Sequence, residues 1–504
     1  MINTDINKLS SLEIAGQLVM PRIDFDQEGH LEKAIRLVED YKVGGFIIFN
    51  GEVNQVRKAV LKLGEISELP LFFGIDAERG LGQMVDGGTR FPFLMSQGAS
   101  ENFDLVKGQA VNTAREMKYC GLNLLFGPVL DINTNPRNPI INVRAFGDDP
   151  ELVSKLGSIF YNTLKNENIF ACGKHFPGHG STDADSHVVL PVIEKTAEEL
   201  SALELIPFRE AVDSGIDFIM AGHLAAAKVD KEEMPATLSR PLITGLLRKE
   251  LGFEKAVITD SFRMDALKEI GPEDKVAIKS LEAGCDIILD PVDGESLVEK
   301  LAVHIEDSQD FSLRAKKSVE KLFSLKKNIQ PPSDSFPDRT LSKELVAEIA
   351  RKSVCLLKGK TIQDNIVDVN IYDVTNSGKD ICDPFIRRLK QNDIQINTIN
   401  FIANESSYKL LNKFDSINVV ITTVAAWTQN SQLTFNFKKV LADISRTGEI
   451  NKILISFGSP YVIADFLDYT TIISSFEVIE PCQVETADVL TGKTVPDSKL
   501  PVKF

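Results

Sequence analysis

The chain has 504 residues, a formal net charge of −16, and hydrophobic residues at 43% of its composition. A chain of this length exceeds what one hydrophobic core usually serves, so we expect two domains. The acidic balance argues against a nucleic-acid partner, because binding phosphate groups requires clustered Lys and Arg. The sequence contains no apolar run of about 18 residues, the length that a membrane span needs. The N-terminal segment also lacks the apolar core of an export signal, so we expect a cytoplasmic protein.

Cysteine is sparse, and the six cysteines are scattered along the chain. No two of them stand in a Cys-x-x-Cys spacing, so neither a zinc knuckle nor a redox pair is predicted. Thiols in apolar surroundings are typical of proteins from a reducing compartment. This agrees with the cytoplasmic prediction.

Eight short apolar runs alternate with amphipathic stretches over the first 330 residues. In chain order the runs cover residues 17–23, 44–50, 70–76, 122–132, 169–176, 216–223, 255–260 and 285–291. Continuous apolar runs are typical of parallel strands that helices cover on both faces. Eight such units favour a closed (β/α)₈ or TIM barrel; a doubly wound open sheet, the alternative, usually has fewer strands.

A segment rich in Pro, Ser and Asp at 330–340 separates this region from a second alternation of strand-like runs and helical patterns. The second region contains five or six such runs, among them residues 367–374, 394–401, 417–427, 452–458 and 471–477. Their number indicates an open three-layer sheet. We therefore predict an α/β protein with a barrel domain at 1–329, a linker at 330–340 and a smaller open α/β sandwich at 341–504.

Ionisable residues gather at one end of the predicted strands. They stand at the carboxyl ends of five of the eight runs: Asp76, Lys174 with His175, His223, Asp260 and Asp290. In a (β/α)₈ barrel the active site is built at this end. Some polar residues are expected wherever strands stop, but a convergence of acids, a lysine and histidines favours a functional site.

The segment 174–191, KHFPGHGSTDADSHVVLP, holds three of the six histidines of the chain. His175 and His179 are four residues apart, but the Pro and Gly residues between them exclude the helix that a zinc site with this spacing needs. The acids further along this loop have no cysteine beside them. We therefore expect neither a metal nor any other cofactor.

His187 follows Asp185 by two residues in the same glycine-rich segment. An aspartate beside an imidazole favours its protonated form and orients the ring, which suits a group that first donates and then accepts a proton. A mobile loop could carry such a group onto a bound substrate. A polar surface loop with incidental histidines is the alternative interpretation.

Asp260 ends the apolar run AVITD, at the carboxyl end of the seventh predicted strand. A carboxylate in this position can attack the anomeric carbon of a sugar, as in a retaining glycosidase. Its alternative role is the N-cap of the following helix. The ionisable residues predicted around it favour the catalytic role.

Four segments of the chain resemble glycoside hydrolase family 3, and within it the β-N-acetylglucosaminidase branch. They are residues 74–92, 127–153, 174–191 and 257–267. The sequence KHFPGHG followed by Asp-Ser-His is the most specific of these features, since β-glucosidases of the family place a glutamate acid/base elsewhere. The region after 341 is similar to the accessory α/β sandwich of that family.

The resemblance implies a role for each matching residue. Asp260 would be the nucleophile, and His187 the acid/base assisted by Asp185. The sugar hydroxyls and the N-acetyl group would be held by a further set of residues: Asp76, Arg144, Lys174, His175 and His223. Charge-assisted bonds of this kind hold a sugar ring through an oxocarbenium-like transition state.

One segment departs from the family pattern. Where the family typically has Asp-x-Glu-Gly-Gly-Arg-Val-x-Arg, this chain has Leu81 and Met84 in place of the two arginines, with Arg79 nearby.

The sequence thus predicts a retaining exo-β-N-acetylglucosaminidase acting on small carbohydrates from cell-wall muropeptide or chitin. The alternatives are a β-glucosidase, a β-hexosaminidase or a phosphorylase of the same family, or a non-catalytic carbohydrate-binding protein.

Overall fold

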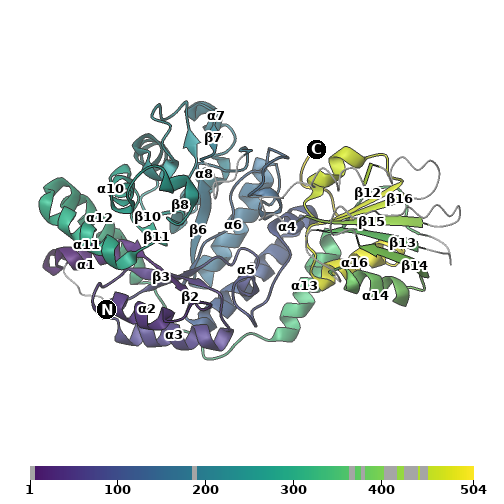
Figure 1. The fold of residues 1–504 in the computed structure, drawn as a ribbon, viewed down its shortest axis with the longest axis horizontal. Helices are drawn as coiled ribbons and strands as arrows, with labels where there is room; N and C mark the ends of the chain where they lie inside the picture. Colours follow the sequence, from purple (N-terminus) through teal and green to yellow (C-terminus); the bar gives the residue numbers. More distant parts are fainter. Residues whose placement is uncertain are drawn as a thin grey trace. The chain divides into compact units, whose positions relative to one another are not determined.

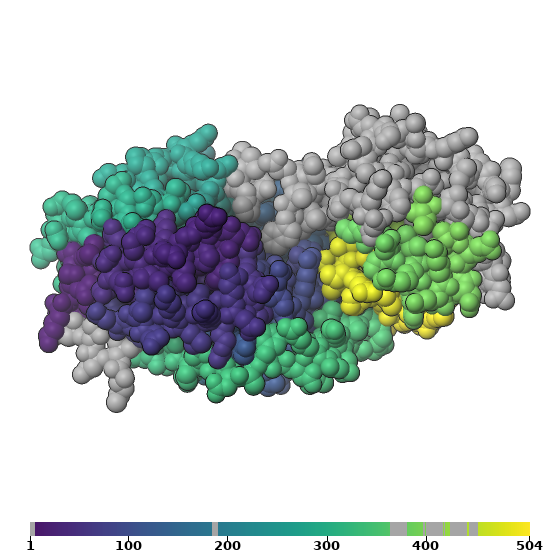
Figure 2. Space-filling model, turned by 60° about the horizontal axis from the view of Figure 1, so that its bottom comes forward, coloured from purple at the N-terminus to yellow at the C-terminus, as the bar shows by residue number. Residues whose placement is uncertain are grey.

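The computed structural model describes residues 6–183, 190–362, 369–375, 381–401, 417–424, 441–442 and 452–504; the remaining residues are grey in Figures 1 and 2. The chain divides into two compact units. The first comprises Met1–Arg90, Val106–Ile132 and Val153–Ser342. The second comprises Phe91–Leu105, Asn133–Leu152 and Lys343–Phe504, so two segments from the first third of the chain belong to it.

Each of the eight predicted apolar runs contains strand residues. In chain order the strands are β1 (Val19–Met20) with β2 (Arg22–Asp24), β3 (Gly45–Phe49), β4 (Phe72–Ile75), β5 (Leu124–Leu125), β6 (Phe170–Phe176), β8 (Phe218–Ala221), β10 (Ala256–Thr259) and β11 (Ile288–Leu289). Seven of them form one sheet in the order β10-β8-β6-β5-β4-β3-β2, in which all pairs are parallel. β1 pairs in parallel with β11, and Ile258 in β10 bridges Ile287 just before β11. The first unit is therefore an α/β fold with a curled parallel sheet.

Helices lie outside the strands of this sheet (Figure 1). They are α1 (Ser11–Gln17), α2 (His30–Glu39), α3 (Val53–Ile66), α5 (Phe103–Cys120), α6 (Pro150–Asn166), α7 (Ala197–Ser201), α8 (Ile206–Asp213), η5 (Pro241–Glu250), α9 (Asp265–Lys268), α10 (Glu273–Ala283), α11 (Gly294–Asp307) and α12 (Gln309–Lys326). A short parallel pair, β7 (Val192–Ile193) before α7 with β9 (Ala225–Ala226) before η5, stands outside the main sheet. α2 and α3 lie side by side, within the continuous purple-to-blue surface of Figure 2. None of the helices in the described part of the chain is long and apolar enough to cross a membrane.

Local sequence explains where several of these helices begin and end. Ser10 caps α1 through a capping box with Glu13, in which each residue bonds the backbone N–H of the other at 3.2 and 2.8 Å. Pro150 occupies the first position of α6, where no N–H is needed. Gly284 ends α10 with a φ of +128°, a conformation that other residues rarely adopt.

Aromatic rings fill the amino-terminal end of the sheet. Phe72, Phe170 and Phe218, the first residues of three strands, contact one another edge to face with centroids 5.3 to 6.0 Å apart. The Lys326 ammonium lies 5.2 Å from the centroid of the Phe72 ring and donates a hydrogen bond to Gln17 at 2.6 Å. This end is packed, which leaves the carboxyl ends of the strands as the place for a site.

The second unit is built on a six-stranded sheet in the order β12-β17-β16-β15-β13-β14. Its strands are β12 (Cys355–Lys358), β13 (Val369–Thr375), β14 (Ile396–Phe401), β15 (Ile417–Val424), β16 (Lys452–Gly458) and β17 (Thr471–Ser475). All neighbours are parallel except β12, which is antiparallel to β17. The sequence patterns predicted the other five strands and missed β12, which is short and only partly buried.

Both faces of this sheet are covered in the described part of the chain. Ile453 and Ile455 of β16 pack with residues of α14 (Asp383–Gln391) and α16 (Glu480–Leu490). Leu454, which points to the opposite face, packs with residues of η6 (Pro460–Phe466). This alternation with a period of two is the reason that the strand reads as a continuous apolar run. α4 (Leu94–Ser100) and α13 (Arg339–Ser353) are further helices described in this part of the chain.

Candidate active site

Lys174, near the carboxyl end of β6, is held by two acids. Its Nζ lies 2.6 Å from Asp76 Oδ1 and 2.7 Å from Glu78 Oε1. The side chains of Lys174 and Glu78 are each 3% exposed, whereas that of Asp76, just after β4, is 25% exposed. A buried ammonium needs such partners. Lys174 and Asp76, both predicted site residues, are thus brought together, and Asp76 is the more exposed of the two.

Glu78 was not among the predicted site residues. It lies in the same segment as Asp76, two positions later, and its side chain is buried. Two acids separated by one residue after a buried strand could have indicated Glu78 as a site residue from the sequence. What the sequence could not show is that both carboxylates would converge on one ammonium about a hundred residues away.

Asp131 organises the two histidines that follow Lys174. Its Oδ2 lies 2.7 Å from His175 Nδ1 and accepts the His175 backbone N–H at 3.1 Å, while Oδ1 accepts the His179 N–H at 2.6 Å. Burial acts to raise the pKa of Asp131, but the two imidazoles and the His179 N–H outweigh it and lower the pKa below its ordinary value. The result is a buried carboxylate that orients the His175 ring.

Asp131 was also missed by sequence reasoning, because it is the second-last residue of the apolar run 122–132. It is fully buried. An acid within a run of buried residues is itself a signal, since such a group must be paired. The sequence did not reveal its partners. His175 was predicted, and the structure places it next to Lys174 on the same strand.

Asp260 directly follows β10, as predicted, and is partly exposed. Its backbone N–H donates to the carbonyl of Ala221 at 2.9 Å, and its Oδ1 accepts the N–H of Ser261 at 2.8 Å. The next helix, α9, begins at Asp265 and has Met264 at its N-cap position. The alternative interpretation of Asp260 as a helix N-cap is therefore wrong, since no helix starts beside it.

Three of the predicted site residues act on one buried thiol, Cys172 in β6. Burial raises the pKa of Cys172 well above its ordinary value. The charge of Lys174 opposes this shift, and the charges of Asp76 and Asp260 add to it. Coulombic effects of this kind fall off with distance, so these three charges all act near the same point of the strand. Asp260 is therefore grouped electrostatically with the ion pair of Lys174 and Asp76.

His223, beyond β8, is fully buried and lies beside the segment that follows Asp260. Its Nε2 is 3.0 Å from the Ser261 carbonyl, and its Nδ1 is 2.9 Å from the Thr237 hydroxyl. Because a carbonyl only accepts, the proton belongs on Nε2, and Nδ1 can accept from the hydroxyl. His223 therefore fixes the backbone next to Asp260.

Asp290, beyond β11, is fully buried and is held by two arginines and a serine. Arg22 in β2 approaches both carboxylate oxygens, and Arg263 Nε lies 3.1 Å from Oδ1. Ser261 Oγ donates to Oδ2 at 2.7 Å. Like His223, Asp290 supports the turn that carries Asp260.

The segment that departs from the family pattern is folded inward. Leu81 is fully buried, Met84 is partly exposed, and Arg79 is 8% exposed. The Arg79 N–H donates to Gln83 Oε1 at 3.1 Å. Leu81 thus contributes to the core, which explains an apolar residue at this position.

Three predicted site residues remain. Asp185 and His187 fall outside the residues that the structure describes. Arg144 belongs to the second unit, where it is 4% exposed and donates from its guanidinium to the Ile140 carbonyl at 3.1 Å. Among the described residues, no group of three or more His, Cys, Asp or Glu side chains is arranged to hold a metal ion.

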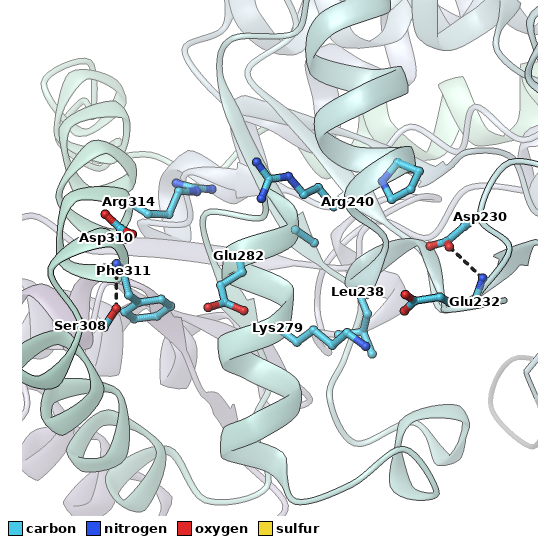
Figure 3. Close-up of a pocket in the computed structure, with 12 residues that line it drawn as sticks. Asp230, Glu232, Leu238, Arg240, Lys279, Glu282, Ser308, Asp310, Phe311 and Arg314 are labelled. Carbon is cyan, nitrogen blue, oxygen red and sulfur yellow. Dashed lines mark hydrogen bonds between the residues drawn. The ribbon is translucent and has the colours of Figure 1, made fainter.

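A separate pocket of about 690 Å³ lies beside α10 and α12 (Figure 3). The residues that line it are Asp230, Glu232, Leu238, Arg240, Pro241, Lys279, Glu282, Ala283, Ser308, Asp310, Phe311 and Arg314. None of them belongs to the predicted site. Its charged side chains are of both signs, and most are exposed.

The chain resembles known proteins over half of its length or more. Residues 12–325 match the family model described as "Glycosyl hydrolase family 3 N terminal domain". The chain is 31% identical to beta-hexosaminidase A of Pseudoalteromonas piscicida over 280 residues, which are 51% of this chain and 47% of that protein. It is 35% identical to a beta-hexosaminidase of Thiobacillus denitrificans over 264 residues, which are 50% of this chain and 73% of that protein.

A solved structure covers nearly the whole chain. It is that of a glycoside hydrolase family 3 beta-N-acetylglucosaminidase from Paenibacillus sp., 29% identical, with a TM-score of 0.85 over 98% of this chain and 99% of that one. The family model alone spans more than half of the 504 residues. The chain therefore belongs to glycosyl hydrolase family 3.

Proposed function

We propose that the protein is a retaining exo-β-N-acetylglucosaminidase that releases terminal N-acetylglucosamine from cell-wall muropeptide or chitin-derived fragments. The observation that carries the proposal is the position of Asp260: a partly exposed carboxylate at the end of β10, grouped electrostatically with Lys174 and Asp76. The names of the relatives, beta-hexosaminidase and beta-N-acetylglucosaminidase, support the choice of sugar.

In the proposed reaction Asp260 attacks the anomeric carbon while the glycosidic bond breaks, and His187 donates a proton to the leaving oxygen. Water then attacks the same carbon while His187 accepts a proton from that water, and the bond between the sugar and Asp260 breaks. Asp185 would orient the His187 imidazole and favour its charged form. Two inversions at one carbon retain its configuration.

The substrate would be held by Asp76, Arg144, Lys174, His175 and His223. Asp76 is the best placed of these, because it is the exposed member of the lysine pair. His175 would act with its ring already oriented by Asp131. Both ring nitrogens of His223 lie within hydrogen-bond distance of protein groups, which supports a role in holding the turn that carries Asp260. The predicted contact of His223 with substrate stays part of the proposal.

For the architecture we propose a closed (β/α)₈ barrel at 1–329, a linker at 330–340 and an accessory α/β sandwich at 341–504. The parallel β1–β11 pair and the Ile258–Ile287 bridge support closure, since they join the two edges of the curled sheet. We also propose a cytoplasmic location, as expected for recycling of cell-wall fragments. The six cysteines, all buried and none in a disulfide, support a reducing compartment.

A comparison of chromogenic substrates tests this proposal against its alternatives. We expect the 4-nitrophenyl β-N-acetylglucosaminide to be cleaved with a kcat/KM at least about tenfold above that of the β-glucoside, a difference of about 1.4 kcal/mol. Preference for the glucoside would indicate a β-glucosidase. Turnover that requires inorganic phosphate, with a sugar 1-phosphate as product, would indicate a phosphorylase. Binding of N-acetylglucosamine without turnover of either substrate would indicate a non-catalytic protein.

A further inference from the structure

Asn133 joins the two ends of a long loop in the second unit. Its backbone N–H donates to the Gly147 carbonyl at 3.0 Å, and its Oδ1 accepts the N–H of Asn142 at 2.9 Å. Asn133 is 1% exposed, so these bonds are shielded from water. The segment 133–147 is thus closed by contacts that converge on one residue.

Tyr461 reaches this asparagine from the C-terminal part of the chain. It lies in η6, three residues after β16 ends. Asn133 Nδ2 donates to the Tyr461 hydroxyl at 2.6 Å, and this hydroxyl lies 3.3 Å from the Asn133 carbonyl, to which it donates. Burial raises the pKa of Tyr461 above its ordinary value, and the bond to Asn133 opposes this only in part. The phenol is therefore protonated at neutral pH and can serve as donor and acceptor at once.

The C-terminal tail holds the other end of the same segment. The N–H of Asp148 donates to the Pro501 carbonyl at 3.1 Å, and the N–H of Lys503 donates to the Asp148 carboxylate at 2.7 Å. A Cβ on Gly147 would lie 2.5 Å from the Pro501 carbonyl oxygen, so this close approach requires glycine. Val502 is 5% exposed and packs in an apolar cluster.

The segment held in this way carries functional residues along the chain. It contains Arg144, whose guanidinium donates to the Ile140 carbonyl. It also begins two residues after Asp131, which orients His175. Residues near a reacting centre must be placed within a few tenths of an ångström, so the support of such a loop affects binding.

We propose that Tyr461 and the tail 501–503 form a clasp on residues 133–148, and that the Tyr461 hydroxyl is the positioning group that sets where Arg144 meets the substrate. The assignment of Arg144 to substrate binding rests on the proposed function. The clasp gives the C-terminal region a role in substrate binding.

The first test compares Tyr461→Phe with Tyr469→Phe in the full chain. Tyr469 is a matched control, because it is a fully buried tyrosine in the same unit whose hydroxyl donates to the Leu441 carbonyl at 3.0 Å, away from the loop. We expect Tyr461→Phe to raise KM for an N-acetylglucosaminide about fivefold with kcat changed less than about twofold, the effect of one neutral hydrogen bond. Tyr469→Phe should leave both constants within about twofold of wild type. Equal kinetic effects in the two variants would overturn the proposal.

A second test needs no turnover and so separates this proposal from the proposed function. Hydrogen exchange of peptides covering 133–148 should be at least about fivefold faster in Tyr461→Phe than in wild type and unchanged in Tyr469→Phe. Unchanged exchange in Tyr461→Phe would contradict the proposed clasp. Faster exchange with unaltered KM would remove its role in substrate binding. If wild type cleaves no N-acetylglucosaminide while exchange still responds, the proposed function fails and the clasp stands.

A double-mutant cycle then tests the contact itself. If Tyr461 acts through Asn133, adding Tyr461→Phe to Asn133→Ala should change KM and exchange no further than Asn133→Ala alone. Additive effects of the two substitutions would show that the hydroxyl acts elsewhere and would overturn the proposal.

Discussion

At the amino ends of the strands in the first unit, the fully buried carboxylate of Asp286 is shared by three cations. Arg248, Arg314 and Lys321 lie 2.6 to 3.3 Å from its oxygens, and Ser318 donates to it at 2.6 Å. At the carboxyl ends the balance is reversed, because one buried ammonium, Lys174, is shared by two carboxylates.

The exposure of the groups differs as well. Asp286 is fully buried, whereas Asp76 and Asp260 at the other end are partly exposed. Burial acts to raise the pKa of Asp286, but its cations outweigh this and hold the pKa at about 2. A carboxylate saturated by the protein's own cations serves stability, whereas partly exposed acids can meet a ligand. The two ends of the same strands are thus specialised, as in other barrel-like α/β proteins.

The largest expected effect is on turnover at the carboxyl end. Asp260→Ala should lower kcat by at least about 10³, because the covalent step loses its nucleophile. The thermal midpoint should stay within about 2 °C of wild type, since Asp260 is partly exposed. Steady-state kinetics and a melting curve on the same sample check both. Near-normal activity, or covalent labelling of another residue by a fluorinated sugar, would contradict the assignment.

A smaller and more selective effect is expected from His187→Ala. Protonation of the leaving group contributes about 10² to 10⁴ in rate when that group is poor and little when it is good. The variant should therefore lose far more activity on an alkyl N-acetylglucosaminide than on the dinitrophenyl one, and Asp185→Ala should follow the same pattern more mildly. Equal losses on both substrates would mean that His187 binds the sugar and does not donate a proton.

At the amino end the expected effect is on stability. Asp286→Ala leaves Arg248, Arg314 and Lys321 without their shared carboxylate, which should lower the free energy of unfolding by about 3 kcal/mol while kcat of the folded protein stays near wild type. The lowered pKa means that this stability is present above the unfolded pKa of about 4 and is lost as pH falls toward 2. Denaturant unfolding at pH 7 and pH 3 measures both. A variant that keeps its stability but loses kcat would reverse the comparison of the two ends.

The smallest expected effect concerns Lys326, which burial alone gives a pKa of about 7 in the folded protein. The unfolded chain holds this proton up to about pH 10.5, whereas the folded protein releases it above about pH 7. The free energy of unfolding of the wild type therefore rises from pH 7 to 10.5, and this contribution is lost as pH falls back to 7. Lys326→Met lacks the titration. Its stability relative to wild type should be greatest at or below pH 7 and should decline by about 1 to 3 kcal/mol by pH 9.5. Urea unfolding of both proteins across this range checks the sign, and a difference independent of pH would show that the lysine does not titrate there.

Much of the first unit was predictable because its information is local. Each apolar run between 17 and 291 contains strand residues, since a strand buried on both faces needs apolar residues in sequence. Asp76 and Asp260 directly follow their strands as expected, and Lys174 lies near the carboxyl end of β6. The short β12 escaped prediction, because its residues are only partly buried and its pattern is weak.

The sequence by itself therefore determined the strand segments, the ionisable residues at the carboxyl ends of the strands, and the family. Tertiary structure alone decided which distant groups meet: Glu78 with Lys174, Asp131 with His175, and Asn133 with Tyr461, 328 residues later. It also placed residues 91–105 and 133–152 in the second unit rather than with the strands that flank them in sequence. The physical reason is that periodicity and strand ends are set by neighbours within a few residues, whereas pairing of buried polar groups depends on chain closure over long separations, which leaves no local pattern.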